Sequence, residues 1–298
     1  MRSTGHWFEA LMLAGLGIGC LFAGEVLPEP ATGVTEGSVA DAPRRVVGAS
    51  VAAAEMLFDL GVPPAGVHYL AADPRYSTAA DRARTANLLG GEAEDILRAR
   101  PDLVVVDPFT KPETLELLSM VGVRVFRPAN AACLDQALEN VRALGELLGR
   151  GSEATAILAD VRARRTALAA NRGAVGIWRV MSLDGGLYTH GKGSLIDAVI
   201  AEAGAIDLSR ERGVGPYRRL DAETVLAWRP DALLIGIEPG TEEQERARLL
   251  QHPALGVLPC VRRERLLFVP AALLGCTSHR VLGAAELIQR RLLDWGAP

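Results

Sequence analysis

One motif occurs twice in this chain, as Glu94-Asp-Ile-Leu-Arg-Ala-Arg-Pro-Asp-Leu-Val-Val-Val-Asp107 and as Glu223-Thr-Val-Leu-Ala-Trp-Arg-Pro-Asp-Ala-Leu-Leu-Ile-Gly236. The copies lie 129 residues apart (223 − 94 = 129) and share the pattern Glu-x-x-Leu-x-x-Arg-Pro-Asp. Each copy predicts a short helix with an acidic residue near its start, where the helix dipole favours negative charge. The proline stops that helix, and the apolar run after it is typical of a strand buried on both faces. The repeat therefore predicts two similar α/β lobes.

The composition is that of a globular chain with two cores. With 298 residues, the chain is long enough for two domains of ordinary size. Hydrophobic residues make up 49% and charged residues 23%, so both halves can bury a core. The net charge of −4 gives no electrostatic argument for binding nucleic acid.

The amino terminus resembles an export segment. Arg2 precedes an apolar run over residues 10–23, which is short for a membrane span. Residues 1–24 are therefore predicted to be an export signal or a lipoprotein anchor, with lipidation at Cys20. Residues 25–43 are rich in Gly, Pro, Thr and Glu, so we predict a flexible tether there.

Helix and strand patterns alternate on both sides of the motif. They predict an N-terminal α/β lobe over residues 44–149 and a C-terminal α/β lobe over residues 173–298. Residues 150–172 are predicted to be a connecting helix, with helical spacing over 153–170 and Ser152 as its N-cap. This helix has no strand partner in its own half of the chain, so we expect it to link the lobes rigidly.

Three finer predictions give the bounds of two strands and of one irregular stretch. Residues 67–70 are predicted to form a strand, and residues 71–91 are predicted to be polar and irregular. Residues 175–182 are predicted to form the first strand of the second lobe.

Signals for enzymes and metal sites are weak. Gly186-x-x-x-x-Gly191-Lys192 resembles the start of a phosphate-binding loop, but Gly193 occupies the place where that loop needs Ser or Thr for magnesium. Only five histidines are present, which disfavours a zinc site of several histidines. An enzyme on a paired α/β scaffold, such as a chelatase or a nucleotide-dependent enzyme, remains the alternative function. Three cysteines outside the export segment leave open one disulfide or only buried thiols: Cys133, Cys260 and Cys276.

The export segment, the two lobes, the long helix and the duplicated motif resemble the class III solute-binding proteins of bacterial ABC importers. The resemblance covers about residues 44–295. It implies two Rossmann-like α/β lobes with parallel sheets, joined by a long rigid α-helix, with a ligand cleft between the lobes. That family carries iron–siderophores, haem and cobalamin. We therefore expect a binding protein rather than an enzyme, in the periplasm or at the outer face of the cytoplasmic membrane, with no resident cofactor, catalytic residue or metal site.

The expected ligand site lies at the carboxyl ends of the strands, where open α/β sheets bind ligands. Aromatic rings there suit a large flat ligand such as a corrin or porphyrin. The phenolate of Tyr76 or Tyr217 suits haem iron, and Arg218 and Arg219 suit anionic oxygens of a chelate. The predicted ligand-binding residues are Ser50, Tyr76, Phe109, Leu187, Tyr188, Tyr217, Arg218, Glu238, Leu274 and His279.

The resemblance also implies docking. In that family one surface glutamate on each lobe meets arginine pockets on the two permease subunits, and the repeat places Glu94 and Glu223 at those positions. The alternative is that both carboxylates only stabilise helix N-termini, by less than about 1 kcal/mol each. The expected partners are an ABC permease dimer and a metal chelate, with membrane contact only through the N-terminal anchor. We expect the chain itself to be a monomer, and the Arg-Pro-Asp turn to fix the corner between helix and strand.

Overall fold

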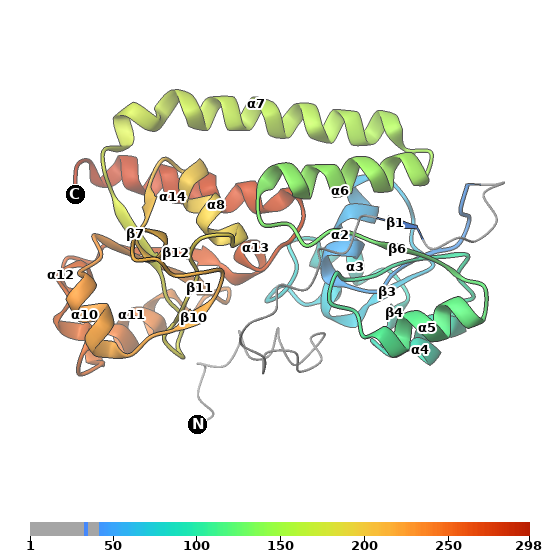
Figure 1. Cartoon of the computed structure of the whole chain (residues 1–298), viewed down its shortest axis with the longest axis horizontal. Coiled ribbons are helices and arrows are strands. Elements are labelled where there is room, and N and C mark those ends of the chain that lie inside the picture. Colours follow the sequence, from blue (N-terminus) through green and yellow to red (C-terminus); the bar gives the residue numbers. More distant parts are fainter. Residues whose placement is uncertain (1–32, 35–41) are drawn as a thin grey trace.

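The computed structural model describes residues 33–34 and 42–298 (Figure 1). The predicted export segment with Cys20 lies outside the described residues, as does most of the predicted tether. Within that tether, Gly33–Val34 is a strand, β1, which pairs antiparallel with β6 (Arg124–Arg127). In the described part, no helix combines the length and the apolar character that crossing a membrane requires.

The first lobe is built on a six-stranded sheet in the order β1-β6-β5-β2-β3-β4, parallel except for β1. Its remaining strands are β2 (Val46–Gly48), β3 (Gly66–His68), β4 (Leu88–Leu89) and β5 (Leu103–Val105). Its helices are α2 (Val51–Asp59), η1 (Tyr69–Ala72), α3 (Ala80–Ala83), α4 (Ala93–Arg98), α5 (Pro112–Met120) and α6 (Leu134–Leu147). The stretch predicted to be irregular therefore contains α3 and β4.

The second lobe is built on a four-stranded parallel sheet in the order β12-β11-β7-β9. A separate antiparallel pair joins β8 (Tyr188–Thr189) to β10 (Arg218–Arg219). The sheet strands are β7 (Arg179–Ser182), β9 (Ile206–Asp207), β11 (Ala232–Ile237) and β12 (Leu266–Pro270). The helices are α8 (Leu195–Glu202), α9 (Leu208–Glu211), α10 (Ala222–Trp228), α11 (Glu242–Gln251), η2 (Leu255–Val257), α12 (Pro259–Arg262), α13 (Ala271–Leu274), η3 (His279–Val281) and α14 (Leu282–Trp295).

The two Arg-Pro-Asp turns form the predicted corners between helix and strand. In the first, the carboxylate of Asp102 accepts hydrogen bonds from the backbone N–H groups of Arg44 and Arg45, at 2.8 and 3.0 Å. In the second, the carboxylate of Asp231 accepts one from the N–H of Arg179, at 2.9 Å. Each aspartate therefore ties its turn to the start of the neighbouring strand, β2 or β7. The strands that follow, β5 and β11, are buried along their whole length, as predicted.

Helix α7 spans Gly151–Val175 and links the lobes along one side of the molecule (Figure 1). Its 25 residues correspond to about 37 Å at 1.5 Å per residue. The helical spacing predicted over residues 153–170 is shorter than α7 at both ends, and the connecting helix predicted over residues 150–172 ends three residues before α7 does. Ser152 lies inside the first turn instead of capping it, and Val175 belongs to α7, so the first strand of the second lobe begins later, at Arg179.

The packing of α7 explains its weak sequence signal. Four of its 25 residues are buried, seven positions apart, which leaves most of the helix facing solvent. The buried stripe packs on the first-lobe core at its start and on the second-lobe core thereafter, and consists of Ala154, Val161, Leu168 and Val175.

Helix α6 also joins the cores of the two lobes. Val141 and Leu144 pack into the core of the first lobe. Leu134 and Leu138, nearer the start of α6, pack into the core of the second lobe with residues of α14. The lobes therefore share a continuous apolar contact beside the connecting helix, which limits their relative movement.

Candidate functional site

Two tyrosines stack in the second lobe. The rings of Tyr188 in β8 and Tyr217 before β10 lie 4.8 Å apart between centroids and 3° from parallel. The pairing of β8 with β10 brings them together, because Arg219 lies opposite Tyr188. The Arg219 guanidinium lies 5.8 Å from the centroid of the Tyr188 ring. Since Tyr217 is 37% exposed, the stack presents an aromatic surface with a cation beside it.

The turn that leads into β8 is held by Asp184. Its Oδ1 atom accepts hydrogen bonds from the backbone N–H groups of Gly186 and Tyr188, both at 2.8 Å. Leu187 has a φ of 62° in this turn and packs, partly buried, against the second-lobe core. Four predicted ligand residues therefore lie in or beside this antiparallel strand pair: Leu187, Tyr188, Tyr217 and Arg218.

His190 packs against the tyrosine stack, with its ring 5.2 Å from that of Tyr217. Burial lowers the pKa of His190 to about 4, so its imidazole is neutral at pH 7. Its backbone N–H donates to the Ser182 hydroxyl at 3.0 Å. His190 is not among the ten predicted ligand residues. Within the described residues, no group of three or more His, Cys, Asp or Glu side chains is placed to hold a metal ion.

The first lobe contributes Tyr76 and its neighbour Arg75. The Arg75 guanidinium lies 5.3 Å from the Tyr76 ring centroid and 2.6 Å from the carboxylate of Asp73. The hydrogen bond with Asp73 raises the pKa of Arg75, and the charge of Glu238 in the second lobe raises it further. Arg75 of the first lobe therefore interacts electrostatically with Glu238 of the second lobe.

The other predicted residues have different surroundings. Phe109 is 50% exposed in the loop after β5, where its backbone N–H donates to Asp107 Oδ1 at 2.9 Å. Ser50 caps α2 by accepting the N–H of Ala53 at 3.1 Å. Leu274 is buried in the second-lobe core. Phe109 is therefore open to solvent, whereas Ser50 caps a helix and Leu274 belongs to the core.

One exposed aromatic residue was missed by sequence reasoning. Strand β3 ends at His68 rather than at Leu70, and Tyr69 begins the turn η1 with 49% of its surface exposed. Its ring lies 4.7 Å from that of His68. Tyr69 thus follows the carboxyl end of a strand, the same type of position from which the ligand residues were predicted.

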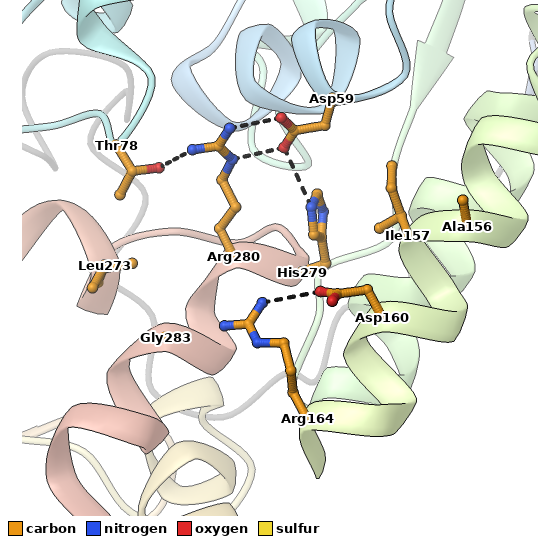
Figure 2. Close-up of a pocket in the computed structure, with 10 residues that line it drawn as sticks. All are labelled: Asp59, Thr78, Ala156, Ile157, Asp160, Arg164, Leu273, His279, Arg280 and Gly283. Carbon is orange, nitrogen blue, oxygen red and sulfur yellow. Dashed lines mark hydrogen bonds and ion pairs between the residues drawn. The ribbon is translucent and has the colours of Figure 1, made fainter. Parts of the chain in front are cut away.

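A hollow with a volume of about 580 Å³ lies between the lobes beside α7 (Figure 2). Among the ten predicted ligand residues, only His279 lines it. His279 Nε2 lies 3.3 Å from Asp59, and the Arg280 guanidinium makes two hydrogen bonds of 2.6 Å to the same carboxylate. Figure 2 shows the pairing of Arg164 with Asp160 on the opposite wall, at 3.4 Å. Because these charged groups are paired with one another, the hollow is a structural junction of the lobes.

A buried carboxylate on α2 completes this junction. Glu55 accepts hydrogen bonds from the hydroxyls of Ser77 and Thr78, at 3.0 and 2.7 Å, and from the thiol of Cys276 in the second lobe, at 3.1 Å. Sequence reasoning did not single out Glu55, although an acidic residue in the middle of an apolar helix was a usable signal. Burial raises the pKa of Cys276 well above its usual value, so the thiol stays protonated.

No disulfide is found among the described residues. Cys133 is partly buried, Cys260 and Cys276 are buried, and all three are free thiols. Of the two possibilities left open by the sequence, the structure shows unpaired thiols.

Glu94 and Glu223 lie in the first turns of α4 and α10, and both are exposed. Within the described residues, neither carboxylate has a hydrogen-bond or ion-pair partner. Figure 1 shows both helices on the side of their lobes that faces away from α7. The repeat thus places two equal, unpaired charges on one side of the molecule.

Comparison with known proteins identifies relatives of this chain. A cobalamin-binding protein of Halobacterium salinarum is 27% identical over 220 residues, which are 70% of this chain and 58% of that protein. This chain therefore spans less than two thirds of that relative's length. The periplasmic heme-binding protein RhuT from Roseiflexus sp. RS-1 is 26% identical, with a TM-score of 0.72 over 84% of this chain and 98% of that chain.

A periplasmic heme binding protein from Pseudomonas aeruginosa is 27% identical, with a TM-score of 0.69 over 83% of this chain and 92% of that chain. The predicted fold, two α/β lobes with parallel sheets joined by a long helix, is confirmed. Residues 46–273 match the family described as periplasmic binding proteins, and they extend through both lobes. This chain belongs to the periplasmic binding protein family.

Proposed function

We propose that this protein captures a metal chelate outside the cytoplasm and delivers it to an ABC permease. The chelate is cobalamin, haem or a ferric siderophore. Membership of the periplasmic binding protein family supports an extracytoplasmic binding role, in the periplasm or at the outer face of the cytoplasmic membrane. Relatives described as cobalamin-binding and heme-binding proteins support this class of ligand.

The observation that carries the proposal is the stack of Tyr188 on Tyr217 beside Arg218 and Arg219. A flat macrocycle gains free energy by covering an exposed aromatic surface. The guanidinium groups then orient it by pairing with propionate, phosphate or catecholate oxygens. This function needs no covalent chemistry, because the residues only bind and orient the ligand.

Residues of the first lobe would enclose the ligand from the other side. Tyr76 is partly exposed, and Phe109 presents half of its surface to solvent. With haem as cargo, the phenolate oxygen of Tyr76 or Tyr217 would hold the ferric iron. Neutral His190 next to Tyr217 adds polarity to the site without a second positive charge.

An absorbance titration of the purified protein tests the ligand class. Haemin, cyanocobalamin and a ferric siderophore are added separately, and one of them is expected to give a saturable one-to-one spectral shift. Tyr217→Ala is expected to lower the affinity for that ligand at least tenfold, because losing a stacked aromatic contact costs about 1–3 kcal/mol. Arg218→Ala is also expected to weaken binding of that ligand, because it removes a guanidinium that pairs with the ligand's anionic oxygens. Its matched control is Arg290→Ala, which should leave binding unchanged, since Arg290 is exposed on α14. The absence of a shift with all three ligands would refute the proposed cargo.

Glu94 and Glu223 are proposed as the docking residues for the two permease subunits. Both are exposed, unpaired within the described residues and related by the repeat, so one monomer of this chain can present equal charges to two like subunits. The double variant Glu94→Gln/Glu223→Gln is expected to lose ligand delivery to permease-containing vesicles while keeping ligand affinity. Asp294→Asn, at an exposed position on α14, is the control that should keep both.

A further inference from the structure

Four residues other than glycine have a left-handed backbone in the described part of the chain. They are Arg100, Leu187, Arg229 and Glu264, with φ values of 49°, 62°, 50° and 55°. This conformation is unfavourable for residues with a Cβ atom, and glycine adopts it most readily. Two of the four have local compensation: Leu187 packs against the second-lobe core, and the Glu264 carboxylate lies 3.1 Å from the Arg246 guanidinium.

Arg100 and Arg229 lack such compensation. Both are exposed, and within the described residues neither guanidinium has a hydrogen-bond or ion-pair partner. Their backbones form the corner between helix and strand, a task that glycine would perform with less strain. The side chains therefore serve no contact inside the described protein. Strained residues of this kind point to a function outside the fold.

Stabilisation of the helix end does not explain Arg100. A cation near a helix C-terminus is favourable because it offsets the unpaired carbonyl groups there. In α4 those groups already have a cation, since the Arg45 guanidinium donates to the carbonyl oxygens of Ala99 and Arg100, at 2.6 and 3.0 Å.

The two arginines repeat the relation of the two docking glutamates. Arg100 follows Glu94 by six residues, and Arg229 follows Glu223 by six residues, in each case across one short helix. Six residues correspond to about 9 Å at 1.5 Å per residue. Each lobe therefore exposes one carboxylate and one guanidinium at opposite ends of the same helix, α4 or α10.

We propose that Arg100 and Arg229 are a second pair of docking contacts, which meet acidic groups on the two like subunits of the permease. This inference rests on the proposed function, which supplies a partner with two like subunits. Opposite charges at the two ends of each helix would fix the direction in which α4 and α10 lie on the partner, because a reversed helix would place like charges together. Two glutamates alone do not set that direction.

The test measures both affinity and stability. The variants Arg100→Gly, Arg229→Gly and the double variant are compared by biolayer interferometry against the nanodisc-embedded permease–ATPase complex that binds the unsubstituted chain. Each single variant is expected to weaken binding about tenfold and the double variant about a hundredfold, because distant sites contribute independently. The loss should shrink in high salt. The melting temperature should stay the same or rise, because glycine relieves the left-handed strain.

Controls separate this inference from its alternatives. Glu264→Gly relieves the same backbone strain outside the proposed contacts, so it should leave affinity unchanged. Weakened binding by Glu94→Gln and Glu223→Gln together with unchanged binding by the glycine variants would overturn the role of the arginines and keep the proposed function. Unchanged binding by all of these variants would overturn docking through α4 and α10 altogether. A lower melting temperature in the glycine variants would assign the arginines to the corner, which also overturns the inference.

Discussion

The amino-terminal ends of β5 and β11 are near duplicates, whereas the loops at their carboxyl ends differ. At the amino-terminal ends, both lobes have an arginine with a left-handed backbone and an aspartate that accepts a hydrogen bond from the start of the neighbouring strand. At the carboxyl ends, β5 leads to the exposed Phe109 and β11 leads to Glu238. Among the described residues, a separate two-stranded sheet such as that of β8 and β10 occurs in the second lobe alone.

This difference shows which part of the duplicated scaffold is constrained. The corner depends on backbone geometry, so the same residues form it in both lobes. Under the proposed docking, a partner with two like subunits would meet the same side chains twice. The proposed chelate has no such symmetry, and loops at strand ends can differ without disturbing the sheet.

Contacts between the lobes form a third region that the repeat does not duplicate. Burial opposes ionisation of Asp59, but the hydrogen bonds and charges of Arg280 and His279 outweigh burial and hold its pKa well below the usual range. Since the folded-state pKa lies below the unfolded one, this pairing stabilises the protein above about pH 4 and is lost as the pH falls further.

The largest effect is expected at this junction. Arg280→Ala should lower the free energy of unfolding by about 2–4 kcal/mol at pH 7, because it leaves a buried carboxylate without its main partner. The loss should be smaller at pH 3, and urea unfolding at both pH values measures it. Arg82→Ala is the control, since Arg82 pairs with the same carboxylate at 3.1 Å from within the first lobe and is half exposed. An equal loss at both pH values would show that ion pairing does not join the lobes.

A second prediction concerns Asp207, a buried carboxylic acid in the second lobe. Burial raises the pKa of Asp207 to about 7, and the charge of Asp197 adds to the rise. Within the described residues its Oδ2 atom has no hydrogen-bond partner. Because the folded-state pKa lies above the unfolded one, the stability of the protein should fall as the pH rises from about 4 to 7.

Asp207→Asn should therefore stabilise the protein by about 1–3 kcal/mol at pH 8 and have little effect near pH 4. Denaturant unfolding across this pH range provides the measurement. Asp197→Asn is the control and should not stabilise, because Asp197 pairs with Arg210 at 3.3 Å. A stabilisation by Asp207→Asn that does not depend on pH would argue against a buried charge as its cause.

The smallest effects are expected at the duplicated corners. Asp102→Ala should cost about 1–2 kcal/mol and Asp231→Ala about 1 kcal/mol, since Asp102 accepts two backbone hydrogen bonds and Asp231 accepts one from Arg179. Thermal unfolding compares the two variants. Asp81→Ala, at a position with a 92% exposed side chain, should change stability by no more than about 0.5 kcal/mol. A larger loss at Asp231 than at Asp102 would show that the number of backbone hydrogen bonds does not set the cost at these corners.

Sequence patterns predicted some elements well and others poorly for physical reasons. The apolar run of β11 is buried on every residue, so it was visible without the structure. Helix α7 buries four of its 25 residues, which leaves a weak helical pattern at its ends. The strand predicted over residues 67–70 stops early because His68 Nδ1 accepts the backbone N–H of Leu70 at 3.3 Å, which favours a turn. That turn exposes Tyr69.

By itself, the sequence determined the two α/β lobes, their shared corner and the positions of Glu94 and Glu223, because helix periodicity, buried strands and a proline stop are local properties. Only the tertiary structure decided which strand-end residues meet. In the structure, Tyr188 stacks on Tyr217 because β8 pairs with β10, and His279 lies at the junction of the lobes beside Asp59. Such contacts join segments far apart in the chain, so they depend on packing that no local pattern records.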